Sequence, residues 1–258
     1  MMRKRMDFTR RNPKTKKVEN TGFMEMKDAE QAGGIELYIY GDIVSASWDA
    51  WSQEDTCPQD IADFMSGIDG NAPMTVYINS GGGDVFAGIA IHSILKRHAG
   101  RKTGVVDGLA ASIASVILMA CDEIVMASGA QIMIHKPSTI AWGNADDFAK
   151  MIVELDKCQQ SITDIYMLKA KEGVTEEEVT GLINAETWMN GEDAQAVFDI
   201  TVEERPAVAA CVGWMMGSYR NKPQGIRTES VEDAAARRQA EEQKELADLL
   251  DDLDLYGI

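Results

Sequence analysis

The sequence predicts an α/β domain over residues 34–204, in which short buried strands alternate with helices. Two observations indicate this fold class. Apolar stretches such as Met74–Ile78 are followed by glycine-rich turns and then by helical periodicity. In addition, 45% of the 258 residues are hydrophobic, which is enough for one large domain with a proper core.

The expected elements follow one another along this domain as strand, turn and helix. Strands are expected at Ile35–Tyr40, Met74–Ile78, Gly104–Val106, Asp122–Ala127, Gln131–Ile134 and Ile200–Val202, with a short extended piece at Glu186–Asn190. Helices are expected at Trp48–Gly67, Phe86–His98, Ile113–Cys121, Asn144–Lys171, Thr175–Ile183 and Gly191–Val197.

The longest helical pattern is Asn144–Lys171, and Asn144 is a residue type that caps helices. Its apolar side, which includes Ile152 and Ile162, is too long for a small core. We therefore expect this helix to protrude from the domain and to pair with a neighbour.

Charge is concentrated at the two ends of the chain. Residues 1–20 contain eight Lys or Arg and two acidic residues, whereas residues 227–258 contain ten Asp or Glu and four Lys or Arg. We expect residues 1–33 to form a basic flexible segment. Residues 205–258 are expected to form a C-terminal extension with an acidic tail whose leucine spacing suits a helix. The net charge of −17 argues against a nucleic-acid partner.

Cysteine usage and hydropathy indicate a cytoplasmic protein. The cysteines, at positions 57, 121, 158 and 211, are widely spaced and form no C-x-x-C pair, which favours reduced thiols over disulfides or a zinc site. The amino-terminal residues lack the apolar core of a secretory signal. The longest apolar run, Gly108–Cys121, is too short to span a bilayer, so no membrane partner is expected.

Ser112 lies where a small-residue turn, Asp107–Ala111, opens into the apolar stretch Ile113–Cys121. A helix that is apolar on all sides is a buried one. Free backbone N–H groups and the positive end of the helix dipole would surround the serine, and these stabilise a nucleophile and an oxyanion. Taken alone, the stretch leaves two interpretations open: Ser112 is a helix cap or a nucleophile.

A second glycine turn, Gly81–Gly83, follows the strand Met74–Ile78. It matches neither phosphate-binding glycine motif, and no lysine follows it, so we predict neither a nucleotide cofactor nor a metal. Of the three histidines, His92 is expected to pack in a helix and His98 to lie on the surface. His135 ends a strand 23 residues after Ser112. The intervening helix and strand can return the chain to the same edge of the sheet, which would place the imidazole near the Ser112 hydroxyl as a general base.

Several stretches in this order resemble the proteolytic subunit family of Clp protease (ClpP). They are INSGGGDVFAG, DGLAASIASVILMACDE, MIHKPS, the long helix and ETWMNGEDA. The resemblance covers about 170 residues and is greatest to the ClpP-related head maturation proteases of tailed bacteriophages. It implies a spiral of β-β-α units shared with crotonases, with a protruding handle helix. It also implies homo-oligomeric rings that stack in pairs through that helix.

The resemblance assigns the roles of nucleophile, base and acid to Ser112, His135 and Glu186. It implies an oxyanion hole formed by the N–H groups of Gly83 and Ile113. The substrate would bind as an added strand between two segments, which here contain Asp84, Val85 and Phe86, and Lys136, Pro137 and Ser138.

Two residues depart from the family pattern. Gly81 replaces a proline, which predicts a more flexible turn, and Glu186 replaces the usual aspartate. Asp193 and Asp164 are weaker candidates for the acid, and a Ser-His dyad is the alternative if no carboxylate reaches His135.

The function implied is a serine endopeptidase that does not itself use ATP and that acts on polypeptides, in particular phage capsid or scaffold proteins. Whether an ATPase partner docks on the protein stays open. The protein itself would be located in the host cytoplasm or the procapsid. The alternatives are a catalytically weak capsid assembly protein, a crotonase-like acyl-CoA enzyme, and a Ser/Lys peptidase that uses Lys136.

Overall fold

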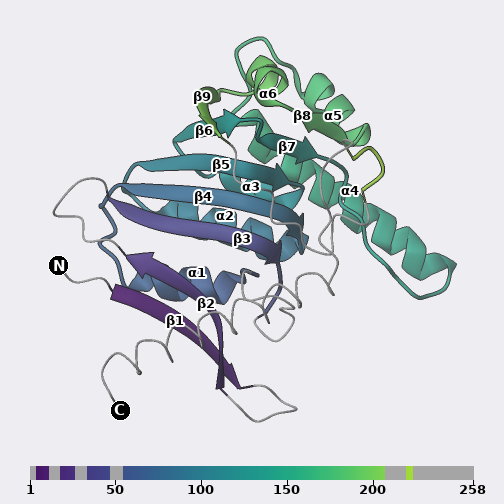
Figure 1. Cartoon of the computed structure of the whole chain (residues 1–258). Helices are drawn as coiled ribbons and strands as arrows, with labels where there is room; N and C mark the ends of the chain where they lie inside the picture. The colour runs from purple at the N-terminus through teal and green to yellow at the C-terminus, as the bar shows by residue number, and fades with distance from the viewer. Residues whose placement is uncertain (1–3, 12–17, 27–33, 47–54, 207–218, 223–258) are drawn as a thin grey trace, which may run out of the picture.

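The computed structural model in Figure 1 describes residues 4–11, 18–26, 34–46, 55–206 and 219–222. Its centre is a parallel sheet with the strand order β3-β4-β5-β6-β9. The short strand β7 extends the sheet beside the end of β5, and β8 pairs antiparallel with β7. The bounds of these strands are β3 Ile35–Ile43, β4 Met74–Gly83, β5 Lys102–Ala111, β6 Glu123–Ser128, β7 Gln131–Ile134, β8 Thr187–Met189 and β9 Thr201–Pro206.

Helices cover the sheet, which confirms the predicted α/β class. In Figure 1, α1, α2 and α3 lie together against one face of the sheet, while α4 extends away from the body of the domain. The bounds are α1 Pro58–Ser66, α2 Val85–Arg97, α3 Ile113–Leu118, α4 Ala145–Met167, α5 Glu176–Asn184 and α6 Gly191–Val197.

The main core joins buried residues of the sheet to buried residues of the six described helices. All six residues of α3 are buried, as its apolar sequence predicts. The central strands β4 and β5 are also buried along most of their length. α3 ends at Leu118, before the predicted end at Cys121. The next residues form turns whose N–H groups bond back to the carbonyls of the short helix.

The protruding helix is confirmed as α4. The Asn144 side chain accepts from the N–H groups of Asp146 and Asp147, which starts the helix at the predicted cap. Only Ile162, Thr163 and Tyr166, near its C-terminal end, are buried. Its amino-terminal half exposes apolar side chains, namely those of Phe148, Ile152 and Val153. Among the described residues, no helix combines the length and the hydropathy needed to cross a membrane.

Two further differences from the expected elements concern the start of α1 and the amino-terminal residues. The helix predicted over Trp48–Gly67 begins only at Pro58, and residues 47–54 lie outside the described residues. Proline favours the first turn of a helix, where its missing N–H costs nothing, so Pro58 sets the start. The segment just before it is extended, and Thr56 forms a β-bridge with Ile43.

The second difference is in residues 1–33, for which we expected no regular structure. β1 (Lys4–Arg11) and β2 (Val18–Met26) form a separate antiparallel pair there. The register pairs Met6 with Met24 and Phe8 with Gly22. The alternation of apolar and polar residues around Met6 and Met24 is a strand pattern. The high density of basic residues led us to interpret the segment as solvated.

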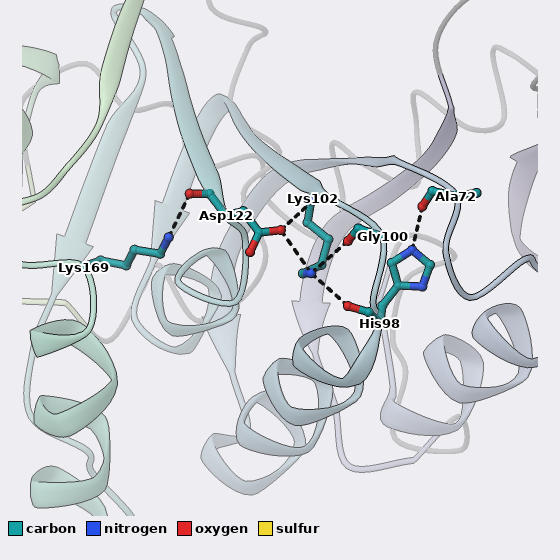
Figure 2. A network of polar contacts seen from close by, with 6 residues as sticks. All are labelled: Ala72, His98, Gly100, Lys102, Asp122 and Lys169. Carbon is teal, nitrogen blue, oxygen red and sulfur yellow. Dashed lines mark hydrogen bonds and ion pairs between the residues drawn. The ribbon is translucent and has the colours of Figure 1, made fainter.

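A polar network ties together the amino-terminal ends of the strands (Figure 2). The buried Lys102 ammonium donates to the carbonyls of His98 (3.0 Å) and Gly100 (3.1 Å) and pairs with Asp122 at 3.1 Å. The Lys102 N–H also donates to the Asp122 carboxylate at 2.8 Å, and Lys169 donates to the Asp122 carbonyl at 3.0 Å. Burial raises the pKa of Asp122, but its hydrogen bonds to Lys102 outweigh this and hold the pKa below its usual value.

His98 belongs to this network, so the expectation that it lies on the surface is wrong. Its side chain is buried, and its Nε2 is 2.8 Å from the Ala72 carbonyl oxygen. The expectation for His92 is confirmed: it is buried in α2, and burial lowers its pKa.

Replacing Lys102 with Met should lower the free energy of unfolding by about 2–3 kcal/mol, because the carbonyls of His98 and Gly100 lose their donor inside the protein. Urea unfolding at pH 7 measures the change. The matched control is Arg101→Met, since Arg101 is exposed and pairs with Glu123 on the surface, where such a pair contributes less than about 1 kcal/mol. Equal losses in the two variants would contradict the structural role of Lys102.

Candidate active site

The candidate site lies at the carboxyl ends of the parallel strands, opposite the Lys102 network. Ser112 directly follows β5, and His135 directly follows β7. The stretch Asp107–Ala111, which we predicted to be a turn, belongs to β5. Strands β5 and β7 are parallel neighbours, and Ala111 pairs with Met133 in their register. The residues that follow the two strands therefore emerge side by side, which confirms that the chain returns to one sheet edge.

Ser112 has the backbone geometry of an exposed nucleophile. Its φ of 54° and ψ of −127° are strained for a non-glycine residue, and they form a sharp turn between β5 and α3. Its N–H donates to the Met133 carbonyl at 2.8 Å, which holds the turn against β7. The side chain makes no capping hydrogen bond to α3. Instead, Ser112 Oγ is 2.7 Å from His135 Nε2, so the cap interpretation of Ser112 does not hold.

The environment of His135 keeps its imidazole neutral and able to accept a proton. Burial lowers the pKa of His135, and the charge of Glu186 partly opposes this by favouring the imidazolium. The net direction is downward from the usual value. A neutral imidazole at hydrogen-bond distance from a hydroxyl has the arrangement of a general base.

Of the three predicted acid candidates, Glu186 is the one whose charge influences the pKa of His135, although no hydrogen bond among the described residues joins the two side chains. Glu186 lies between α5 and β8 with a left-handed φ of 52°. The weaker candidates have other partners. Asp193 accepts from the Asn190 N–H in the cap of α6, and Asp164 accepts from Gln160 on the same helix.

The glycine stretch Gly81–Gly83, which we predicted to be a turn, forms the end of β4 and packs directly against Ser112. Gly82 has φ +97°, and a Cβ there would lie 2.7 Å from the Ser112 Cβ. Gly83 has φ +151°, and a Cβ there would lie 2.0 Å from the Ile43 carbonyl oxygen, so only glycine fits. Ile113 is the first residue of α3, and its N–H has no acceptor within the helix. The sequence-predicted donors Gly83 and Ile113 thus belong to the two segments that meet at Ser112, and their role as oxyanion hole stays a prediction.

Ser115 stabilises the strained turn at Ser112, a role that was not predicted from the sequence. Its buried hydroxyl donates to the Ser112 carbonyl at 2.6 Å and lies 3.2 Å from the Met133 carbonyl oxygen. It is also 2.7 Å from the Tyr166 hydroxyl near the end of α4. The buried position of Ser115 could be read from the sequence, but not these partners, because two of the three lie on β7 and α4.

The predicted substrate-binding segments differ in conformation. Asp84 caps α2 by accepting from the Ala87 N–H at 2.7 Å, and Val85 and Phe86 form the first helical turn. These two residues are therefore not a strand edge, in contrast to the expectation, although Phe86 is 72% exposed. On the other side, residues 136–140 are irregular, with Lys136 and Ser138 exposed and Pro137 half-buried.

A segment beyond β9 completes the surroundings of the site. The Tyr219 ring is buried, edge-on to His135 with 5.1 Å between ring centroids, and it also packs on Trp188. Its hydroxyl donates to the Gly81 carbonyl at 2.5 Å. The N–H groups of Arg220 and Asn221 both donate to Glu186 Oε1 at 2.6 Å. Sequence reasoning missed this segment, because no motif marks it and the resemblance does not reach it.

Together these groups form a serine hydroxyl beside a neutral imidazole, with a carboxylate acting on the imidazole and glycine-turn amides nearby. This is the arrangement of an activated serine nucleophile. Among the described residues, no cluster of His, Cys, Asp or Glu could hold a metal ion.

The comparisons with known proteins agree with this geometry. The Clp protease family profile matches residues 56–197, which is more than half of the chain. This chain belongs to the Clp protease family.

Individual relatives are bacterial. An ATP-dependent Clp protease proteolytic subunit from Bacteroides fragilis is 27% identical over 134 residues, which cover 51% of this chain and 64% of the relative. The ATP-dependent Clp protease proteolytic subunit 1 of Chlamydia abortus is 34% identical over 127 residues, which cover 48% of this chain and 65% of the relative. The chain thus spans slightly less than two thirds of the length of these relatives.

Gly82→Ala should abolish labelling of Ser112 by a fluorophosphonate, because the added methyl group displaces the serine. The control is Gly173→Ala, which has almost the same backbone strain (φ +94°) but no heavy atom within 4 Å of the new Cβ. Both variants should lose about 1–2 kcal/mol of stability from the strain. Labelling of Gly82→Ala at the rate of the Gly173→Ala control would show that this glycine does not shape the site.

Proposed function

We propose that the protein is a serine endopeptidase. The observation that carries this proposal is the 2.7 Å contact between Ser112 Oγ and His135 Nε2 at a strained turn. Ser112 attacks the carbonyl carbon of a peptide bond while its proton passes to His135, and the charge of Glu186 stabilises the imidazolium. His135 then protonates the leaving amine, and water releases the acyl group by the reverse sequence.

The oxyanion that forms in each step needs hydrogen-bond donors. The N–H groups of Gly83 and Ile113 are the candidates, since Gly83 follows the residue packed on Ser112 and Ile113 is the next residue in the chain. Strand addition of the polypeptide would use the mostly exposed residues 136–140, with the first turn of α2 contributing single N–H groups rather than a ladder.

The alternative enzymes fit less well. A crotonase-like acyl-CoA enzyme would need acid and base carboxylates in place of the Ser112–His135 pair. A Ser/Lys peptidase would need Lys136 at Ser112, but the described hydrogen bond of Ser112 is with His135 and Lys136 is exposed. The geometry therefore favours the Ser-His mechanism over both alternatives.

Self-assembly into rings, with two rings joined through α4, is part of the proposal. The support is the set of apolar side chains that α4 and the preceding loop leave in solvent, including Trp142 at 94% exposure and Ile140 at 89%. The relatives are proteolytic subunits of ATP-dependent Clp proteases. By analogy, an ATPase partner would deliver unfolded polypeptides to this chain. ATP use would belong to that partner.

The narrower role, maturation of phage capsid or scaffold proteins in a host cytoplasm or procapsid, rests on the Glu-Thr-Trp stretch at 186–188 and on the oppositely charged ends of the chain. The bacterial relatives give it no support. This role is tested by comparing the cleavage of a co-expressed capsid or scaffold protein with the cleavage of an unfolded protein of unrelated sequence. Equal cleavage of both would favour a general peptidase.

Fluorophosphonate labelling tests the proposed activity. The wild-type chain should label on Ser112, and Ser112→Ala and His135→Ala should lose at least about a thousandfold in rate, because nucleophile and base act as a unit. The assembly state of each variant is recorded in parallel. An assembled wild-type particle that does not label would reject the peptidase and favour a scaffold role.

Glu186→Gln should lower the labelling rate and move its acid limb to lower pH. The carboxylate raises the pKa of His135, so its neutral substitute lets burial lower that pKa further, and the imidazole stays unprotonated at more acidic pH. Glu192→Gln, an exposed carboxylate on α6, is the control and should leave the pH profile unchanged. An acid limb that stays in place or moves to higher pH would show that Glu186 does not act on His135.

A further inference from the structure

The segment 219–222 contacts three parts of the candidate site, namely the Gly81 carbonyl, the His135 ring and the Glu186 carboxylate. It lies beyond residue 197, where the match to the family ends. Tyr219 packs in a small buried cluster with Leu109, Ala111 and Met133, residues of the two strands that lead to Ser112 and His135. Tyr219 is thus built into the site at the sheet edge, whereas Arg220 and Asn221 are exposed.

We propose that the segment Tyr219–Asn221 is a positioning element of this active site: Tyr219 holds the glycine turn against Ser112, and the next two backbone amides hold the Glu186 carboxylate. The proposal rests on the proposed peptidase function. It assigns to this chain a part of the catalytic machinery that lies outside the region matched by the family.

The case for Tyr219 rests on where its hydroxyl lies. It donates to the Gly81 carbonyl, and a Cβ on Gly82 would be 3.2 Å from the Tyr219 oxygen and 2.7 Å from the Ser112 Cβ. The hydroxyl therefore sits where the glycine turn meets the nucleophile. Burial raises the pKa of Tyr219, so the group stays a protonated donor. Because Gly81 has no side chain whose packing could restrict its backbone, this hydrogen bond from Tyr219 fixes the orientation of its carbonyl.

The case for the two amides rests on Glu186. Two N–H groups that converge on one carboxylate oxygen form an anion-binding nest, and they restrict how the side chain can rotate. The Asn221 side chain adds donors to the carbonyls of Ala185 (2.9 Å) and Glu186 (3.3 Å). The left-handed backbone of Glu186 is thereby held from two sides, although the residue makes no hydrogen bond to His135 in the described structure.

The first test compares Tyr219→Phe with the wild-type chain in fluorophosphonate labelling over a range of probe concentrations. Removing the hydroxyl should lower the limiting rate by about tenfold and leave the half-saturating concentration unchanged, because the lost interaction positions the nucleophile and does not bind the probe. Tyr38→Phe, which removes a partly exposed hydroxyl bonded to Glu36, is the control and should label like wild type. An unchanged rate, or a faster one as expected if the tyrosine obstructs the site, would overturn the proposal.

The second test needs no activity, so it separates failure of this proposal from failure of the proposed function. The chain has three histidines, and the His135 pKa can be followed by NMR with ¹³C-labelled histidine. Asn221→Ala removes the side-chain donors that hold the segment on the carbonyls of Ala185 and Glu186. The two backbone amides should then no longer fix the Glu186 carboxylate, and the His135 pKa should fall in the same direction as in Glu186→Gln. Arg220→Ala, which keeps the backbone N–H and changes an exposed side chain, should leave it unchanged. A wild-type pKa in Asn221→Ala, or no shift in Glu186→Gln, would refute the role of the segment.

Discussion

The pairing of Ala111 with Met133 is the constraint on which the site depends. A parallel register puts the ends of β5 and β7 at one level, and the Ser112 N–H bonds to the Met133 carbonyl just beyond it. A slip of one residue would turn the side chains to the other face of the sheet and separate Ser112 from His135. The buried Ser115 hydroxyl bridges the same two segments, so the register and the strained turn stabilise each other.

The two edges of the sheet carry different kinds of polar structure. At the amino-terminal edge, Lys102 has carbonyl and carboxylate partners within 3.1 Å, so its charge is compensated where it is buried. At the carboxyl edge, Ser112 and Glu186 both have positive φ, which costs free energy. The strained residues thus lie at the edge that carries the candidate site, on loops that a packed sheet positions.

The fold class, the buried helix α3, the protruding α4 and the Ser112–His135 pair could be predicted from the sequence. Each depends on a local pattern: apolar strands, an apolar run after a small-residue turn, a capping residue, and a histidine at a strand end. The expectation for His98 was wrong because neighbouring basic residues suggested solvent, whereas tertiary packing buries its ring against Ala72. Tyr219 and the partners of Ser115 could not be predicted, since their contacts join residues far apart in the chain and no local periodicity encodes them.

The place of Tyr219 in the chain has a consequence for biosynthesis. Ribosomes add about 5–20 residues per second, so Ser112 and His135 are made several seconds before the segment that contacts Gly81 and Glu186. During that interval the nascent chain holds its serine and imidazole without the tyrosine hydroxyl and without the amides that fix the glutamate. The completed geometry exists only in chains whose translation has passed Asn221, which delays its formation until the strands and helices around it have been synthesised.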